Sequence, residues 1–200
     1  MTLEQLTAFF CRAATYPSST QSLRNHFLNP GICTEAAVLL AVVFHQQQWQ
    51  ILLTRRSDGL RQHNGQIAFA GGRRDAQDLN PTDTALRETA EEIGVLPQFW
   101  QTFPVLPPHY TPSGYEVHPI PAICTHSPVI HANADEVAEV FYLPLSSALH
   151  PAAYGERTLS YRNQRLASPV LPYLHYDIWG LTAIILFSLA ERYQSHLATQ

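Results

Sequence analysis

The most informative part of the sequence reads Arg87-Glu88-Thr89-Ala90-Glu91-Glu92-Ile93-Gly94-Val95. On a helix, which turns about 100° per residue, Glu88, Glu91 and Glu92 share one face, with side chains roughly 5–6 Å apart. The opposite side, which is predicted to face the core, carries Leu86, Ala90 and Ile93. Like charges so close repel each other, and a divalent cation held by carboxylate oxygens removes that repulsion. The helix face is therefore a candidate metal site, with a solvated acidic surface as the alternative.

Residues on both sides of this stretch mark the ends of the helix. Asn80 is a preferred N-cap residue, Pro81 suits the first helical position, and Asp83 places a negative charge in the first turn. Gly94 can adopt the left-handed conformation that ends many helices. The sequence therefore predicts a helix that begins near Asn80 and ends at Gly94.

A short glycine-rich segment precedes the helix. Gly71-Gly72 can bring backbone N–H groups close to an anion because no Cβ intervenes, and the basic pair Arg73-Arg74 follows directly. Taken alone, the acidic face would be interpreted as solvated surface, and a bare Gly-Gly as a turn or a helix connection. Glycines, cations and acidic face together indicate a site for a divalent metal and a phosphate. Mg²⁺ in particular is typically completed by the phosphates of its substrate.

The N-terminal part of the chain supplies further elements. An amphipathic helix is predicted over Leu3–Ala14, and a polar connector over Tyr16–Gly31. The apolar, β-branched run Ala36–Phe44 predicts a strand that is buried on both faces. Trp49–Thr54 predicts a second strand, which pairs with the first as a hairpin.

Strands and one helix are also predicted nearer the C-terminus. Val117–Cys124 and Glu136–Leu143 look like strands, although Pro119 and Pro121 push the first toward a sheet edge or a bulge. Ile178–Tyr193 predicts a final amphipathic helix. Because helices and strands interleave without repeats, we expect one mixed α/β domain over residues 31–195. Residues 1–30 are expected to pack on it as an N-terminal helix and connector.

Composition limits the classes of function. The chain has 200 residues, an apolar fraction of 46% and a formal net charge of −4, which argues against disorder and against non-specific binding to nucleic acid or an anionic membrane. Its three cysteines fit neither a disulfide framework nor zinc-ligand spacing. The N-terminus has no early basic cluster and no long apolar run, so neither a signal peptide nor a transmembrane span is predicted. We expect a cytoplasmic enzyme with a small anionic substrate, and a homodimer is compatible with these features.

The segment from Gly72 to Val95 resembles the signature of the Nudix family. That signature has a glycine, five residues, a glutamate, seven residues, and then Arg-Glu-apolar-x-Glu-Glu-x-Gly-apolar. Gly72 matches the first glycine, and the end of the signature matches Arg87-Glu88 and Glu91-Glu92-x-Gly94-Val95, with Thr89 at the apolar position. Asp78 stands where the family has its glutamate, and one extra residue separates it from Arg87. No firm role is therefore assigned to Asp78.

An upstream segment resembles one branch of that family, the coenzyme A pyrophosphatases. The similarity lies in Leu52-Leu53-Thr54-Arg55-Arg56-Ser57, then Leu60, His63, Gly65 and Phe69-Ala70-Gly71-Gly72. Thr84-Ala85-Leu86 before the Arg-Glu pair is also typical of the branch, as is the extra residue. With weaker similarity downstream, the resemblance covers roughly residues 36–190.

The resemblance implies a fold and a metal-dependent chemistry. The fold is a Nudix-like α/β/α sandwich with a mixed central sheet. Glu88 and Glu92, with Glu91 close behind, would hold Mg²⁺ or Mn²⁺ against a diphosphate, and Arg87 would orient these glutamates. The catalytic base is expected among Glu91, Glu136 and Glu139. The candidate substrate contacts are Arg56, Arg61, Arg73, Gly71 and Gly72.

The implied reaction is hydrolysis of the diphosphate bond of coenzyme A or an acyl-CoA, which gives 3′,5′-ADP and (acyl-)4′-phosphopantetheine. One alternative is a Nudix hydrolase with another specificity, for ADP-ribose, a dinucleotide or a nucleoside triphosphate. The other is a Nudix module that senses a nucleotide without cleaving it. Three clustered carboxylates argue against the sensor, because binding alone does not require them.

Overall fold

The computed structural model describes residues 1–28, 31–59, 65–161 and 164–199. Its centre is strand β1 (Thr34–His45), which continues through a hairpin into β2 (Gln48–Arg56). On its other side β1 pairs in parallel with β7 (Tyr115–Cys124) along most of its length. β2 in turn pairs antiparallel with β8 (Val137–Pro144). The predicted hairpin and strands are confirmed.

Short strands complete this sheet around the long ones. β3 (Ile67–Ala68) pairs with β2, and β4 (Gly71–Arg73) pairs with β1. β5 (Gln101–Thr102) and β6 (His109–Tyr110) both pair with β7. Because β1 and β7 are parallel while the other pairs are antiparallel, the sheet is mixed, as predicted.

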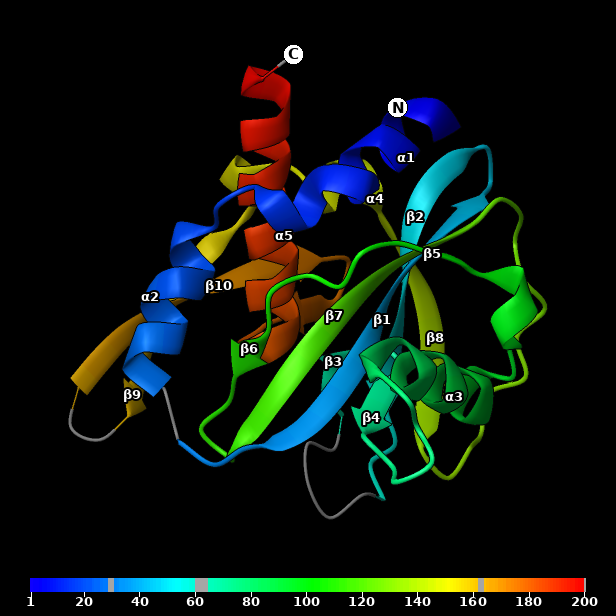
Figure 1. Cartoon of the computed structure of the whole chain (residues 1–200), viewed down its shortest axis with the longest axis horizontal. Helices are drawn as coiled ribbons and strands as arrows, with labels where there is room; N and C mark the ends of the chain where they lie inside the picture. Colours follow the sequence, from blue (N-terminus) through cyan, green and yellow to red (C-terminus); the bar gives the residue numbers. More distant parts are fainter. Residues whose placement is uncertain (29–30, 60–64, 162–163, 200) are drawn as a thin grey trace.

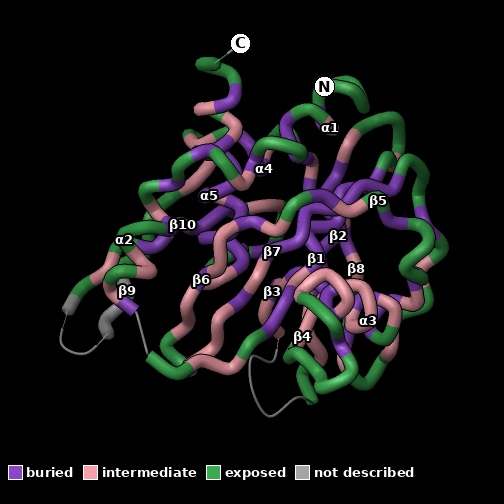
Figure 2. The backbone as a smooth tube through the Cα atoms, in the orientation of Figure 1, coloured by how far each residue is buried: buried purple, intermediate pink, exposed green. Residues whose placement is uncertain are grey.

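Helices cover both faces of the sheet. Leu40 and Val42 of β1 belong to the core beneath α1 (Leu3–Arg12) and α5 (Gly180–Ala198), whereas Leu39 and Ala41 pack toward α3 (Pro81–Ile93). Successive strand residues point to opposite faces, so a strand covered on both sides is apolar throughout. Figure 1 shows the three layers, and Figure 2 shows buried residues concentrated along β1, β2 and β7. The architecture is the predicted α/β/α sandwich.

The predicted connector over Tyr16–Gly31 was partly wrong. Residues Ser19–Leu28 form helix α2, which lies against α5 (Figure 1). The polar sequence concealed this helix because its N-terminal turn is fixed by a distant side chain. The Glu191 carboxylate on α5 accepts hydrogen bonds from the hydroxyls of Ser18 and Ser19 and from the backbone N–H of Thr20.

The prolines of β7 occupy a different environment from the one predicted. The strand lies between β1 and the short strands β5 and β6, not at the sheet edge. The carbonyl oxygens of Pro119 and Pro121 accept hydrogen bonds from Leu106 N (3.0 Å) and Phe103 N (2.9 Å). This side of β7 faces irregular chain between β5 and β6, where the missing proline N–H groups interrupt no ladder.

Two further features were not predicted: a second, smaller sheet and a later start of the final helix. β9 (Gly155–Tyr161), β10 (Gln164–Tyr173) and β11 (Tyr176–Ile178) form an antiparallel sheet, so Ile178 ends a strand and the final helix begins at Gly180. Much of α5 is buried, because it packs against β10 as well as α2. The remaining elements are short: α4 (Leu145–Ala148) and the 3₁₀ turns Ala13–Thr15, Pro97–Phe99 and Pro151–Ala153. Within the described ranges, every helix is too short or too polar to cross a membrane.

Candidate active site

Helix α3 begins and ends as predicted. The Asn80 side chain accepts hydrogen bonds from the backbone N of Thr82 (2.8 Å) and Asp83 (3.1 Å), and Pro81 occupies the first helical position. Gly94 ends the helix with a φ of 74°, in the left-handed region that favours glycine. Local backbone chemistry fixes both ends, so the sequence was sufficient to find them.

The prediction of the buried face of α3 was partly wrong, although Ile93 is fully buried as predicted. Leu86 and Ala90 are only partly buried, whereas Thr89 and Glu92 are buried on the side that faces the sheet. Thr89 tolerates this position because its hydroxyl donates to the Ala85 carbonyl, at 2.6 Å, within the same helix. The acidic face is therefore not uniformly solvated, because Glu92 is buried whereas Glu91 is exposed.

Glu92 is the most deeply placed of the acidic residues on α3, with 3% of its surface exposed. Its carboxylate accepts a hydrogen bond from the Gly71 N–H (3.3 Å) and lies 3.7 Å from Nη1 of Arg56. Burial raises the pKa of Glu92 to about 7, and the contacts with Gly71 and Arg56 oppose this shift only in part. A carboxylate so desolvated is stabilised in its ionised form by a bound cation.

Glu88 lies one helical turn before Glu92, against strand β4. A Cβ on Gly72 would overlap the Glu88 carboxylate, so glycine at this position makes room for it. At Gly71, where φ is 152°, a Cβ would overlap the backbone of β1. Burial raises the pKa of Glu88, and the charges of Glu91 and Glu136 add to that effect. Glycines 71 and 72 thus bring the strand, Glu88 and Glu92 into close contact.

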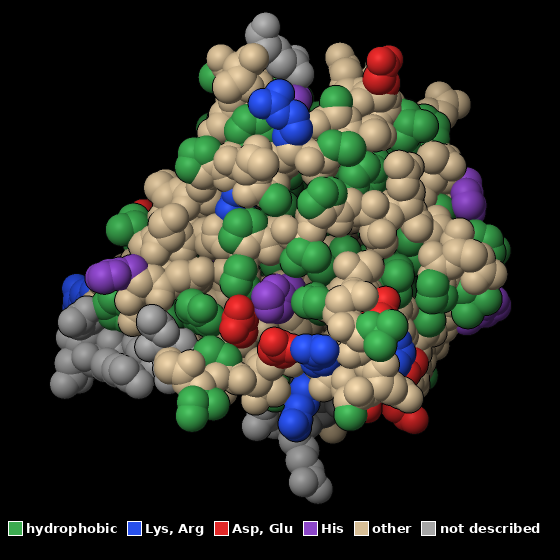
Figure 3. Space-filling model, viewed as in Figure 1, with side chains coloured by type: hydrophobic (Ala, Val, Ile, Leu, Met, Phe, Trp, Pro, Cys, Tyr) green, Lys and Arg blue, Asp and Glu red, His purple; other side chains and the backbone are tan. Residues whose placement is uncertain are grey.

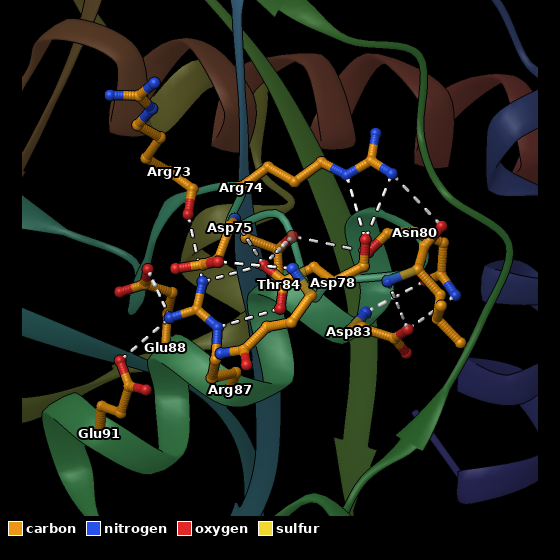
Figure 4. A network of polar contacts seen from close by, with 12 residues as sticks. Arg73, Arg74, Asp75, Asp78, Asn80, Asp83, Thr84, Arg87, Glu88 and Glu91 are labelled. Atoms are coloured by element: carbon orange, nitrogen blue, oxygen red, sulfur yellow. Dashed lines mark hydrogen bonds and ion pairs between the residues drawn. The ribbon is translucent and has the colours of Figure 1, made fainter.

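Arg87 connects the acidic residues to Asp78. Its guanidinium donates to both Asp78 oxygens (3.0 and 2.9 Å), to Glu88 (3.0 Å) and to Glu91 (3.1 Å), as Figure 4 shows. The Arg73 carbonyl accepts a further bond from it at 3.2 Å. This arrangement holds the pKa of Asp78 well below its usual range and raises that of Arg87.

The structure shows the contacts of Asp78, to which the sequence assigned no firm role. Besides Arg87, it accepts hydrogen bonds from the Thr84 hydroxyl (2.9 Å) and the Asp75 N–H (2.8 Å). Its buried carboxylate thereby fixes the loop before α3 and the guanidinium at once. The extra residue before Arg87 is accommodated without loss of this contact. The only sequence signal for it was an acidic residue separated from Gly72 by five residues.

The candidate bases lie in different surroundings. Glu136 is partly buried just before β8, and its charge adds to the raised pKa values of both Glu88 and Glu92. Glu139 on β8 instead accepts a hydrogen bond from the Tyr176 hydroxyl and lies 3.8 Å from Arg55. The Glu91 side chain is 57% exposed and its described contact is with Arg87.

The residues that were predicted to contact phosphates also lie in different surroundings. Arg56 faces Glu92, and its Nε has no hydrogen-bond partner among the described residues. Arg73 is exposed and lines a cavity of about 400 Å³ with Arg74, Asp75, Ala76, Arg87 and Glu88. Arg74 is bound by Glu35 and by the Asp78 carbonyl. Arg61, with Leu60 and His63, lies outside the described residues. Figure 3 shows basic and acidic side chains gathered at the lower edge of this face.

The residues present fit a hard divalent cation. Within the described ranges, no three histidine, cysteine or carboxylate side chains form a ready-made metal cage. Mg²⁺ does not require one, because it is usually bound by one or two carboxylates together with water and substrate phosphates. Two desolvated carboxylates, Glu88 and Glu92, supply that donor set.

Comparisons with known proteins indicate the family. Residues 34–162 match the model of the NUDIX domain. The chain is 40% identical over 156 residues to a protein of Pectobacterium atrosepticum named "Uncharacterized Nudix hydrolase NudL", which covers 78% of this chain and 81% of that protein. A protein of the same name from Photorhabdus laumondii is 40% identical over 159 residues, or 80% of this chain and 84% of that one.

Solved structures share the fold at low sequence identity. A C. elegans Ap4A hydrolase in a binary complex aligns with a TM-score of 0.52 and 15% identity, over 84% of this chain and 99% of that one. A MutT/nudix family protein from Enterococcus faecalis aligns with a TM-score of 0.52 and 17% identity, over 98% of this chain and 75% of that one. Together with the family model and the relatives that are 40% identical, these matches lead to one conclusion: the chain belongs to the Nudix hydrolase family.

Proposed function

We propose that this protein catalyses metal-dependent hydrolysis of a diphosphate bond, with coenzyme A or an acyl-CoA as its substrate. The products are 3′,5′-ADP and (acyl-)4′-phosphopantetheine. The observation that carries the proposal is the pair of desolvated carboxylates on α3, Glu88 and Glu92, beside a fixed arginine and a cationic cavity. The preference for coenzyme A is supported by the upstream similarity around Leu52–Ser57 and Phe69–Gly72.

In this proposal Glu88 and Glu92 hold Mg²⁺ or Mn²⁺, with Glu91 at the edge of the metal site. The metal, when bound, neutralises diphosphate charge and lowers the pKa of a water molecule. Arg87 keeps the carboxylate of Glu88 in place through a side chain that is itself clamped by Asp78. Arg56 keeps Glu92 oriented toward the sheet by its charge.

We assign the role of general base to Glu136. Two observations support this role: the charge of Glu136 acts on both Glu88 and Glu92, and Asn133 is hydrogen-bonded both to the Glu92 carbonyl and to the Glu136 side chain. Glu139 is less suited because Tyr176 and Arg55 already occupy its oxygens. Glu91 is less suited because it is largely exposed and paired with Arg87. Glu136 would take one proton from water as the oxygen attacks phosphorus and the P–O bond to the leaving phosphate breaks.

Substrate phosphates are proposed to bind along Arg73 and the strand β4 that contains Gly71 and Gly72. Arg73 is exposed beside Glu88, and its guanidinium suits bidentate phosphate binding. We also propose that Arg56 and Arg61 contact the 3′-phosphate of coenzyme A.

We also propose that residues 31–195 form the hydrolase domain with residues 1–30 packed on it. A cytoplasmic location and a homodimer stay predictions of the sequence.

The test is product analysis after incubation with coenzyme A, acetyl-CoA, ADP-ribose, a dinucleoside polyphosphate and nucleoside triphosphates, with Mg²⁺, with Mn²⁺ or with EDTA. Metal-dependent release of 3′,5′-ADP from coenzyme A, faster than cleavage of the other compounds, is the expected result. Faster cleavage of another compound would retain the metal site and overturn the coenzyme A preference. Saturable nucleotide binding without cleavage under any condition would identify a sensor and overturn the proposed activity.

A further inference from the structure

A second cavity lies far from the candidate active site, between α2, α5 and the sheet of β9 and β10. Its volume is about 640 Å³, within the range of about 300–1,000 Å³ that is usual for small-molecule sites. Its lining is mainly apolar and includes Phe27, Tyr154, Leu166, Ile184 and Phe187. Most of the lining comes from residues before 34 and after 162, outside the match to the family model.

Arg24 brings a positive charge to this apolar cavity. The side chain is half-buried, and its guanidinium makes neither an ion pair nor a hydrogen bond within the described part of the chain. Its Nε is shielded from water without an acceptor, and burial lowers the pKa of the group. A cation that is partly desolvated without a partner is unfavourable, so this position favours an anion.

Ser168 is a second unsatisfied polar group in the lining. It is 3% exposed, and its hydroxyl has no hydrogen-bond partner among the described residues. It lies on β10, whereas Arg24 lies on α2, so the two groups approach the cavity from different elements. Native proteins leave few buried polar groups unpaired, and such groups call for a specific explanation.

The neighbouring charges do not neutralise Arg24. Arg192, which like Arg24 acts on His109, is positively charged and is held by carbonyl oxygens of Ala13 and Tyr16 and by the side chain of Gln21. The Glu191 carboxylate is occupied by the N-terminal turn of α2. Glu156 and Arg165, of opposite charge, line the cavity as exposed residues.

We propose that this cavity binds an amphiphilic anion, an aliphatic carboxylate whose charged end pairs with Arg24 and whose chain lies against the aromatic and aliphatic lining. The site is separate from the diphosphate site: its lining comes from α2, α5 and β9–β10, whereas the acidic residues lie on α3, on the opposite face of the central sheet (Figure 1). Binding of a ligand in this cavity can therefore be measured without turnover of a diphosphate substrate.

Calorimetric titration of the full chain with decanoate tests the proposal, with decanol as the uncharged probe of equal length. Saturable binding of decanoate is expected, at least about tenfold tighter than binding of decanol, because a charge-assisted hydrogen bond adds that much. Arg24→Gln should weaken decanoate binding at least about tenfold and leave decanol binding unchanged. Arg157→Gln on β9, outside the cavity lining, is the matched control and should bind as the wild type does.

A second variant tests the cavity independently, in case the Arg24→Gln protein does not fold. Ala167 is exposed at the cavity, so Ala167→Trp should fold normally and block decanoate by filling the space. Decanoate should raise the thermal midpoint of the wild type and of Arg157→Gln, but of neither cavity variant. Absence of saturable binding to the wild type would overturn the proposal. Equal affinities for decanoate and decanol, or an unchanged affinity in a folded Arg24→Gln protein, would overturn the role of the anion.

Discussion

At the scale of single residues, Glu92 combines deep burial with a carboxylate that has few partners. Replacing it with glutamine keeps the shape and the contact with Gly71 but removes the charge that a metal requires. We expect Glu92→Gln to lower kcat about 10²–10³-fold, as loss of a charge-stabilising group commonly does. The free energy of unfolding should stay within about 1 kcal/mol of the wild type, because the buried charge is itself costly.

Steady-state kinetics with Mg²⁺ and urea denaturation check this prediction. Glu139→Gln is the matched control, since that carboxylate is occupied by Tyr176 and Arg55 and lies outside the metal site. The control should keep kcat within a factor of about three. Near-normal turnover by Glu92→Gln would exclude the proposed metal site, and a large loss in Glu139→Gln would move the general base from Glu136 to Glu139.

Asp78 is expected to act on catalysis through Arg87. Asp78→Asn removes the charge opposite a bidentate guanidinium, so Arg87 should lose its fixed position beside Glu88. We expect kcat to fall about 10–100-fold and the protein to lose about 1–3 kcal/mol of stability. Asp75→Asn, at an exposed carboxylate three residues earlier, should change neither kcat nor stability by a comparable amount. Equal kinetics for the two variants would assign Asp78 a purely structural role.

His109 makes the stability of the fold depend on pH. Burial lowers the pKa of this imidazole to about 3, and the nearby Arg192 and Arg24 add to the effect. The unfolded chain takes up a proton below its ordinary pKa of about 6.5, whereas the folded chain does not. Stability is therefore complete above that pH and is lost as the pH falls from about 6.5 toward 3, by about 1.4 kcal/mol per unit.

Urea denaturation at several pH values between 7.5 and 5, in about half-unit steps, measures this slope. The difference in unfolding free energy between wild type and His109→Gln should be constant above pH 6.5 and change steadily below it. A difference independent of pH over the whole range would show that His109 titrates normally in the folded protein.

At the scale of elements, α2 depends on a contact from outside its own sequence. The Glu191 carboxylate accepts bonds from Ser18, Ser19 and Thr20, where it also faces the positive end of the helix dipole. We expect Glu191→Ala to destabilise α2 by about 1–2 kcal/mol. Hydrogen exchange of the α2 amides should accelerate about 5–30-fold while exchange in β1 stays unchanged. Glu4→Ala on α1 is the control, and equal α2 protection in both variants would contradict this role for Glu191.

At the scale of the whole molecule, the N-terminal helix is part of the core that covers one face of the sheet. Phe9 is fully buried, with its ring 5.1 Å from that of Tyr193 on α5 and 5.4 Å from that of Phe10. Phe9→Ala should cost about 3–5 kcal/mol of unfolding free energy, measured by urea denaturation. Leu3→Ala, on an exposed face of the same helix, should cost no more than about 0.5 kcal/mol. Similar small losses in both would show that residues 1–30 add little to the core.

The sequence by itself determined the features that depend on neighbouring residues. The ends of α3 follow from Asn80, Pro81 and Gly94, because caps are made by backbone groups within one turn. The strand β1 follows from an unbroken apolar run, because a strand covered on both faces has no position for a polar side chain. The spacing of Glu88 and Glu92 likewise placed both carboxylates on α3 beside the glycines of β4.

Only the tertiary structure decided which of these residues meet across the chain. It turned Glu92 toward the core, set Arg56 beside it and made Asp78 the partner of Arg87. It also formed α2 on Glu191 and left Arg24 facing an apolar cavity. Each of these outcomes depends on groups brought together from distant segments, whose burial and charge exist only once the sheet and its helices are packed. Local patterns cannot contain that information, because desolvation and pairing are properties of the folded neighbourhood.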